Sequence, residues 1–219
     1  MSALRVAAKD LTVELRSREL LDAALLGALA VAVLAGIALA VAPRAEGAAA
    51  ALWLGAVVST TLPLARSFTG EADRGTLDVL LALPVDRGAV LLGKVLSNAL
   101  VALAAEAVLL TAYLGLFGQL GGIDAPGLAL LLVLGTLALS TAGSVLASIA
   151  AQARGREALL PVLLFPLLLP VLLSAVPASI HALRGDGFAA FQGEALLLAG
   201  YDLVLLAVSW LLFDVVVEW

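Results

Sequence analysis

Cysteine is missing from this chain of 219 residues, and methionine and histidine occur once each, as Met1 and His181. Without cysteine the chain has no disulfide framework, no thiolate metal site and no thiol redox chemistry. The absence also leaves the compartment open, because disulfides are the feature from which an oxidising compartment is usually inferred.

Charged residues are scarce as well. Only 13% of the residues are Asp, Glu, Lys or Arg, and a formal net charge of −5 provides no basic surface of the kind that binds nucleic acid. Hydrophobic residues make up 63% of the chain, and the mean hydropathy is +1.14. A soluble domain of this length needs more polar surface to cover its core. The composition therefore predicts an all-α polytopic membrane protein.

Long apolar runs recur along the chain, and about 20 apolar residues are enough for a helix to cross a bilayer core of roughly 30 Å. We predict six transmembrane helices, at residues 20–42, 48–66, 88–117, 127–151, 158–177 and 195–217. No linker, composition shift or internal repeat divides the sequence, so residues 1–219 are expected to form a single transmembrane domain. Only the connections 67–87 and 178–194 are long.

Lysine and arginine are distributed unequally between the two sides of these predicted spans. Of the 12 basic residues, all but Arg44 and Arg184 fall at the N-terminus or in loops on one side. The positive-inside rule places that side in the cytoplasm. Both termini are then cytoplasmic, and residues 178–194 form an outer segment that does not span the membrane.

Residues 1–18 precede the first span and have an amphipathic pattern. Their apolar side chains follow helical spacing, whereas the basic ones lie mostly off that stripe; the apolar positions are Leu4, Ala7, Ala8, Leu11 and Leu15. This pattern predicts an interfacial helix that lies flat on the cytoplasmic side, with its basic side chains toward anionic headgroups. The alternative is a frayed, charged tail.

Residues 70–84, GEADRGTLDVLLALP, are a charged segment between two apolar runs. Glu71 and Asp73 suit a helix N-terminus, which favours negative charge, and Pro84 would end a helix. An apolar face follows at helical spacing, at Leu77, Leu80 and Leu81. On composition alone, a short amphipathic helix parallel to the membrane and an ordinary solvated loop are equally good interpretations.

This segment resembles the cytoplasmic region of ABC-2-type exporter permeases, which carry a glutamate, a GTL[ED] motif, leucines and a closing LP there. The resemblance extends to an N-terminal elbow helix, six spans and a non-spanning outer segment, the fold of the ABC-2 or type V exporter group. It implies that residues 70–84 are a coupling helix that docks on a separate ATPase subunit, which would bind ATP-Mg. The implied contact residues are Glu71, Arg74, Gly75, Thr76, Leu77, Asp78, Leu80, Leu81 and Pro84.

A narrower resemblance is to the heme exporter protein B family of cytochrome c maturation. The total length, Lys94 at the start of the third span, and Pro166 and Pro170 in the fifth span are similar to that family. The resemblance implies a permease subunit in the bacterial inner membrane, without catalytic activity of its own. Its implied partners are an A-type ATPase, a C-type heme-handling membrane subunit, a small D-type subunit and a second permease copy. The implied role is heme export or ATP-driven release of a heme-loaded chaperone.

Several residues within the predicted spans are candidates for a pathway or an interface. Glu106 lies in mid-span, where a carboxylate costs roughly 2.5–3.5 kcal/mol or more, so we expect it to face a cavity or a partner, or to be protonated. Asp202, in the outer part of the sixth span, is a candidate lining group. Pro161, Pro166 and Pro170 indicate either a bent interface helix or simply a kinked packing helix.

No resident cofactor or metal is expected. Heme ligation usually requires His, Met, Cys or Tyr, and His181, Tyr113 and Tyr201 make a poor ligand set. We interpret His181 as a solvated surface residue, and heme as a possible cargo. We also expect Gly135, Ser140, Thr141, Gly143, Ser144 and Ser148 to give the fourth span a small-residue side for close helix packing.

Three other functions remain open at this point. The first is an ABC-2 permease that exports a lipid, glycan or drug, which would keep the coupling helix and change only the cargo. The second is a membrane-embedded enzyme, although the sequence contains no HExxH motif or nucleophile–base pair. The third is a structural scaffold without a transport role.

Overall fold

The computed structural model describes residues 3–18, 21–22, 24–27, 29–31, 33, 45–73, 87–117, 122–151 and 156–216. These residues form an all-helical protein. Its long helices are α1 (Ala3–Ser17), α3 (Ala45–Asp73), α5 (Arg87–Phe117), α6 (Ala125–Ala151), α7 (Arg156–Arg184) and α8 (Gln192–Val216). A short 3-10 helix, η1 (Phe188–Ala190), lies between α7 and α8. The described residues between 21 and 33 are also helical.

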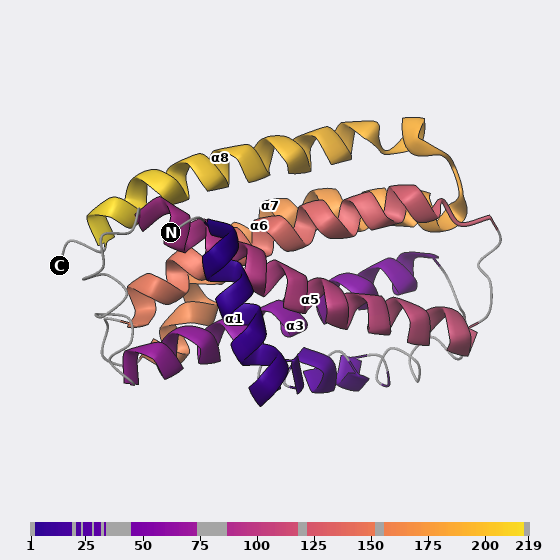
Figure 1. Ribbon diagram of the computed structural model, residues 1–219. Coiled ribbons are helices and arrows are strands. Elements are labelled where there is room, and N and C mark those ends of the chain that lie inside the picture. Colours follow the sequence, from indigo (N-terminus) through magenta and orange to yellow (C-terminus); the bar gives the residue numbers. More distant parts are fainter. Residues whose placement is uncertain are drawn as a thin grey trace.

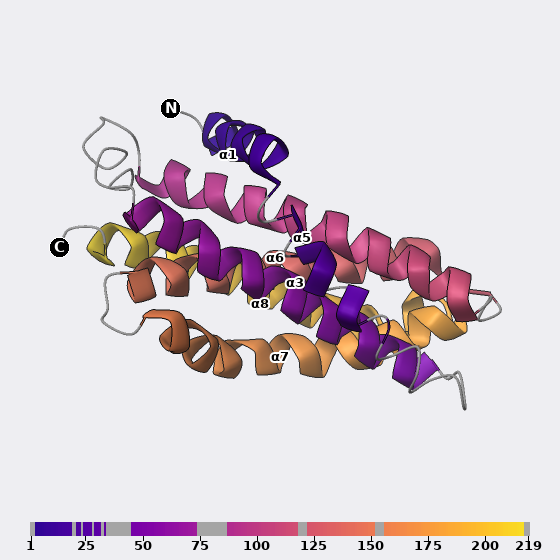
Figure 2. The ribbon, with the colours of Figure 1, turned by 90° about the horizontal axis from the view of Figure 1, so that it is seen from below.

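The five helices from α3 to α8 form one bundle with α6 at its centre, in contact with α3, α5, α7 and α8 (Figures 1 and 2). Helices α3, α6 and α8 run in one direction, and α5 and α7 run in the other. The start of α5 and the ends of α3, α6 and α8 therefore meet at the end of the bundle where both chain termini lie (Figure 1). This alternation is what a chain that crosses a membrane repeatedly requires.

By length and composition, four helices of the described part of the chain could cross a membrane. They are Gly88–Ala112, Ala125–Ile149, Leu163–Arg184 and Gln192–Leu211. They correspond to the expected spans 88–117, 127–151, 158–177 and 195–217, and they support a polytopic membrane protein. The expected span 48–66 lies inside helix α3, and much of 20–42 lies outside the described residues, so six spans remain a prediction.

The centre of the bundle depends on glycines of α6 that receive large side chains of α3. Trp53 is 1% exposed, and its indole Nε1 donates a hydrogen bond to Ser179 Oγ of α7 at 2.9 Å. A Cβ atom on Gly135 would collide with the Trp53 ring, and one on Gly143 would collide with Leu64. The predicted small-residue side of this helix is thus confirmed as a packing surface.

Helix α1 confirms that the N-terminal segment is helical, as predicted. The side chains that it packs against α5 are not all members of the predicted apolar stripe. It crosses the outside of α5 at a steep angle (Figures 1 and 2). Val6 and Ala7 are buried, whereas Leu4 is 71% exposed and Ala8 is also exposed. Val6 lies outside the predicted stripe and packs beside Gly93 of α5. The exposed Leu4 and Ala8 remain available to face lipid, so the interfacial placement stays a prediction.

The connection between α7 and α8 is shorter than expected. Residues 178–184 belong to α7 and residues 192–194 to α8, so only residues 185–191 of the predicted outer segment 178–194 lie between the two long helices. Gly185 and Gly187 adopt φ of 73° and 81°, a left-handed conformation that glycine adopts without steric penalty. Apolar residues such as Ala178 and Ala182 are fully buried, which explains why the helix continues.

Candidate functional site

The predicted coupling segment is only partly described. Residues 70–73, including Glu71, form the last turn of α3, so the predicted start of a separate helix at residue 70 is wrong. The continuous apolar helix before them extends through the acidic residues because nothing in that stretch ends it. The other predicted contact residues lie outside the described part of the chain: Arg74, Gly75, Thr76, Leu77, Asp78, Leu80, Leu81 and Pro84.

A seam of polar side chains joins α5 to α6 inside the apolar bundle. Asn98 Nδ2 donates to Ser144 Oγ at 3.2 Å, and Thr136 Oγ1 lies 2.8 Å from both carboxyl oxygens of Glu106. All four residues are buried. Asn98 and Glu106 are two steps of four residues apart, as are Thr136 and Ser144, so the two antiparallel helices keep one register across the seam.

The same register places Ala102 opposite Ser140, midway between these two contacts. Ala102 is 1% exposed and Ser140 is fully buried. The Ser140 hydroxyl has no hydrogen-bond partner among the described residues. Small residues at this point let the two helices approach closely enough for the pairs on either side to form.

Toward the end of the bundle that carries the termini, α5 contacts α1. Lys94 is 2% exposed, and its Nζ lies 3.7 Å from Asp10 Oδ2 of α1. Next to it, a Cβ atom on Gly93 would press on Val6 and on the Ala3 carbonyl oxygen. Lys94 therefore ties α5 to the N-terminal helix.

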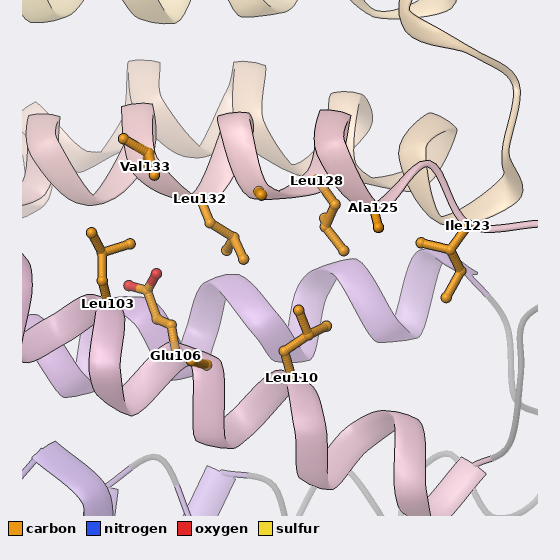
Figure 3. Close-up of a pocket in the computed structure, with 10 residues that line it drawn as sticks. Leu103, Glu106, Leu110, Ile123, Ala125, Leu128, Leu132 and Val133 are labelled. Carbon is orange, nitrogen blue, oxygen red and sulfur yellow. The ribbon is translucent and has the colours of Figure 1, made fainter.

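Toward the other end of the bundle, α5 and α6 separate around a cavity of about 240 Å³ (Figure 3). Ten described residues line it, and Glu106 is the only one among them with a polar side chain. Figure 3 shows its carboxyl at one end of the cavity, between Leu103 and Leu132, with Leu110 and Leu128 further along. Glu106 thus lines a cavity, one of the alternatives expected for it, and its role in a pathway stays a prediction.

Helix α7 runs unbroken through Pro161, Pro166 and Pro170. Pro166 and Pro170 are exposed, as are Phe165 and Leu173, so this face of α7 packs against nothing in the described part of the chain. One hydrogen bond from a neighbouring helix reaches α7 here, since the Tyr201 hydroxyl of α8 donates to Leu167 O at 3.0 Å.

Asp202 follows Tyr201 on α8 and is 4% exposed. Neither of its carboxyl oxygens has a hydrogen-bond partner among the described residues. A buried carboxyl without partners is costly, so its position is consistent with the predicted lining role, although the structure does not bring it together with Glu106 in one cavity.

In the last turn of α7, the predicted surface histidine is partly exposed. His181 Nδ1 lies 2.8 Å from Asp186 Oδ2, and Arg184 pairs with Glu46 of α3 nearby. Within the described ranges, no three potential metal-ligating side chains come together. At this surface an ion pair therefore ties α7 to α3, and a hydrogen bond ties α7 to the turn that follows it.

Sequence reasoning missed the partners of the residues that it found. It identified Glu106 and Lys94, but not Thr136, Asn98 or Asp10. The available signal was the spacing, because Lys94, Asn98 and Glu106 follow a four-residue step on one helix face. Only the packed structure shows which residues of α6 and α1 contact this face of α5.

The comparison with known families decides the assignment. The chain matches the family described as CcmB protein over residues 1–218. The chain belongs to the CcmB family. Since the match runs through every described helix, the α5–α6 seam and its cavity belong to the family domain itself.

Two curated relatives of this CcmB-family chain are both named heme exporter protein B. The protein from Bradyrhizobium diazoefficiens is 32% identical over 136 residues, which is 62% of this chain and 61% of that protein. The protein from Paracoccus denitrificans is 34% identical over 127 residues, which is 58% of each. The chain thus spans about three fifths of the length of the curated relatives that it matches.

Proposed function

We propose that this CcmB-family chain is the transmembrane permease subunit of an ABC transporter that serves cytochrome c maturation. The observation that carries the proposal is the family match over residues 1–218. The names of the two relatives and the four long apolar helices support it. In this role the chain is a transport subunit and not an enzyme, and ATP hydrolysis belongs to a separate subunit.

The proposed contact with the ATPase is the segment from Glu71 to Pro84. Helical spacing in the sequence would place its leucines on one apolar face flanked by acids, which suits insertion into a groove on a soluble partner. The segment leads directly into α5 at Arg87, and the first turns of α5 hold α1 through Gly93 and Lys94. A push on the segment would therefore move α5 and α1 together.

The proposed assembly contains further subunits: the A-type ATPase, a C-type heme-handling membrane subunit, a small D-type subunit and a second permease copy. The exposed proline face of α7 is the surface we assign to a membrane partner, since Phe165 and Leu173 are 61% and 73% exposed there. The whole assembly lies in the bacterial inner membrane, and both termini of this chain are cytoplasmic. Its work is heme export or the ATP-driven release of a heme-loaded chaperone.

Replacing Leu77 and Leu81 by Asp tests this proposal. A carboxylate in the docking groove must be desolvated without a partner, so the ATPase subunit should no longer co-purify, while the chain still inserts. Val85→Asp is the control, because it adds a carboxylate just beyond Pro84, outside the proposed contact, and the ATPase should remain bound. Undiminished co-purification with the double variant would refute the contact.

Heme staining of c-type cytochromes in cells complemented with the same variants tests the cargo. Staining should be lost in the double variant and retained with Val85→Asp. If the ATPase binds the wild-type chain but cells without the chain still mature their cytochromes, the alternative gains support: an ABC-2 permease that exports a lipid, glycan or drug.

A further inference from the structure

The cavity between α5 and α6 opens sideways. Its lining residues Ala107, Ala129 and Val133 are exposed, and both helices have the length and composition to cross a membrane. The medium at the opening is then lipid hydrocarbon and not water. Acyl chains can enter, because the walls are leucine, isoleucine, valine and alanine, and any more specific occupant has to displace them.

Among the described residues that line this cavity, the one polar side chain can distinguish between occupants. Glu106 is 2% exposed, and both its carboxyl oxygens lie 2.8 Å from the single hydroxyl of Thr136. A hydroxyl carries one hydrogen, whereas the two carboxyl oxygens together offer about four acceptor sites. Among the described residues Thr136 is the only hydrogen-bond partner of this carboxyl. Glu106 therefore keeps unused acceptor capacity at the inner end of an apolar cavity.

We propose that this cavity binds an amphiphile with an apolar chain and a hydrogen-bond-donating head, best of all an amine. The head would meet Glu106 between Leu103 and Leu132, and the chain would extend past Leu110 and Leu128 (Figure 3). An amine satisfies the carboxyl in either protonation state of the pair, because the shared proton can reside on nitrogen or on oxygen.

Two other classes of molecule bind less well for physical reasons. A lipid acyl chain fills the same walls but leaves the carboxyl without a second partner, which is costly in a buried, apolar place. An amphiphile with a carboxylate head places two acids side by side and is disfavoured when both are charged. The proposal does not depend on the proposed transport function, because the walls and the carboxyl select the same class whatever the cargo.

Binding of three probes to the purified full chain in nonionic micelles tests the proposal. Dodecylamine, dodecanol and dodecanoate would be added at equal mole fractions, and the shift of the thermal unfolding midpoint would give apparent affinities. Dodecylamine should bind about tenfold more tightly than dodecanoate, as expected for one buried charge-assisted hydrogen bond, with dodecanol between them.

Two pairs of variants complete the test. Glu106→Gln should reduce the ratio of the apparent affinities for dodecylamine and dodecanoate to near one. Glu194→Gln, on the partly exposed start of α8, should leave this ratio unchanged. Ala129→Phe fills the mouth of the cavity and should abolish specific binding, whereas Ala104→Phe, exposed on α5 outside the cavity, should not. The proposal is overturned if wild type shows no preference, if Glu106→Gln keeps it, or if Ala129→Phe binds as wild type does. The Ala129 variant keeps the carboxyl, so the test stands even if Glu106→Gln fails to fold.

Discussion

At the scale of single residues, the packing of the interior depends on glycines at positions where even the methyl group of alanine would not fit. Gly135 and Gly143 of α6 lie where Trp53 and Leu64 of α3 need their space, and an added Cβ would overlap each side chain. In lipid, helix association depends on such close packing, since apolar surface gains little by leaving hydrocarbon. One added methyl group at these positions would therefore push α6 and α3 apart.

We expect Gly135→Ala to destabilise the chain by about 1–3 kcal/mol, the usual cost of overpacking a filled core. Trp53 cannot move aside freely, because its indole nitrogen is bonded to Ser179. Gly200→Ala is the matched control. Gly200 is also in the interior of a helix, but a Cβ there meets nothing within 4 Å, so stability should be unchanged or slightly higher. Unfolding in mixed micelles monitored by circular dichroism measures both. Equal stability of the two variants would contradict the packing assignment.

At the scale of helices, α1 and α5 behave as one element. The N-terminal helix crosses α5 at Gly93, and the ion pair from Asp10 reaches the nearly buried Lys94. Buried ion pairs of this kind add little to the free energy of unfolding, because the cost of desolvation offsets much of the attraction. Their larger effect is on the position in which the two helices pack. The contact thus determines where α1 rests on α5, and α5 in turn begins where the proposed coupling segment ends.

A larger residue at Gly93 should detach α1. In Gly93→Leu the new side chain would occupy the place of Val6 and of the Ala3 carbonyl, so the packed face of α1 should become accessible. The chain contains no cysteine, which allows clean labelling of Ala7→Cys, a position that is 3% exposed. Its maleimide labelling should be slow in the parent and should approach the rate of Ala8→Cys, an exposed position, once Gly93→Leu is added. Continued protection of Ala7→Cys would show that α1 does not depend on this crossing.

At the scale of the whole molecule, the alternation of helix direction places two different surfaces at the two ends of the bundle. One end holds the ion pair of Arg184 with Glu46, the His181–Asp186 pair and η1. The other end holds the chain termini, and the helices α3 and α5 point their adjoining ends toward it (Figure 1). The excess of basic residues in the predicted loops at this second end favours the cytoplasm for it.

This orientation predicts opposite labelling of two single-cysteine variants. Ala189→Cys, exposed in η1, should react with an impermeant maleimide added outside intact cells from which the outer membrane has been removed. Ala8→Cys should react only after the inner membrane is opened. The excess of lysine and arginine on one side is the physical reason, because these side chains are retained in the cytoplasm during insertion. Labelling of Ala8→Cys from outside would reverse the topology.

The sequence by itself determined the class of the protein and its main elements. The length of the apolar runs at 88–117, 127–151, 158–177 and 195–217 was enough, because a bilayer accepts only helices whose backbone groups are satisfied within the segment. The sequence also indicated Glu106 as a candidate residue, since a carboxyl in the middle of an apolar span is costly unless it faces a cavity or a partner. The motif of residues 70–84 indicated only the wider ABC-2 group, and the narrower family resemblance rested on the total length, Lys94 and the proline-rich fifth span.

Tertiary structure alone decided which residues meet. Thr136 as the partner of Glu106, the insertion of Trp53 beside Gly135, and the face that α1 turns toward α5 all depend on how the helices are rotated and staggered. In a uniformly apolar helix the sequence carries little information about rotation, because lipid and neighbouring helices accept the same side chains. For the same reason helix α7 could continue to Arg184: the residues beyond the predicted end at 177 are stabilised by burial against other helices, which no local pattern reveals.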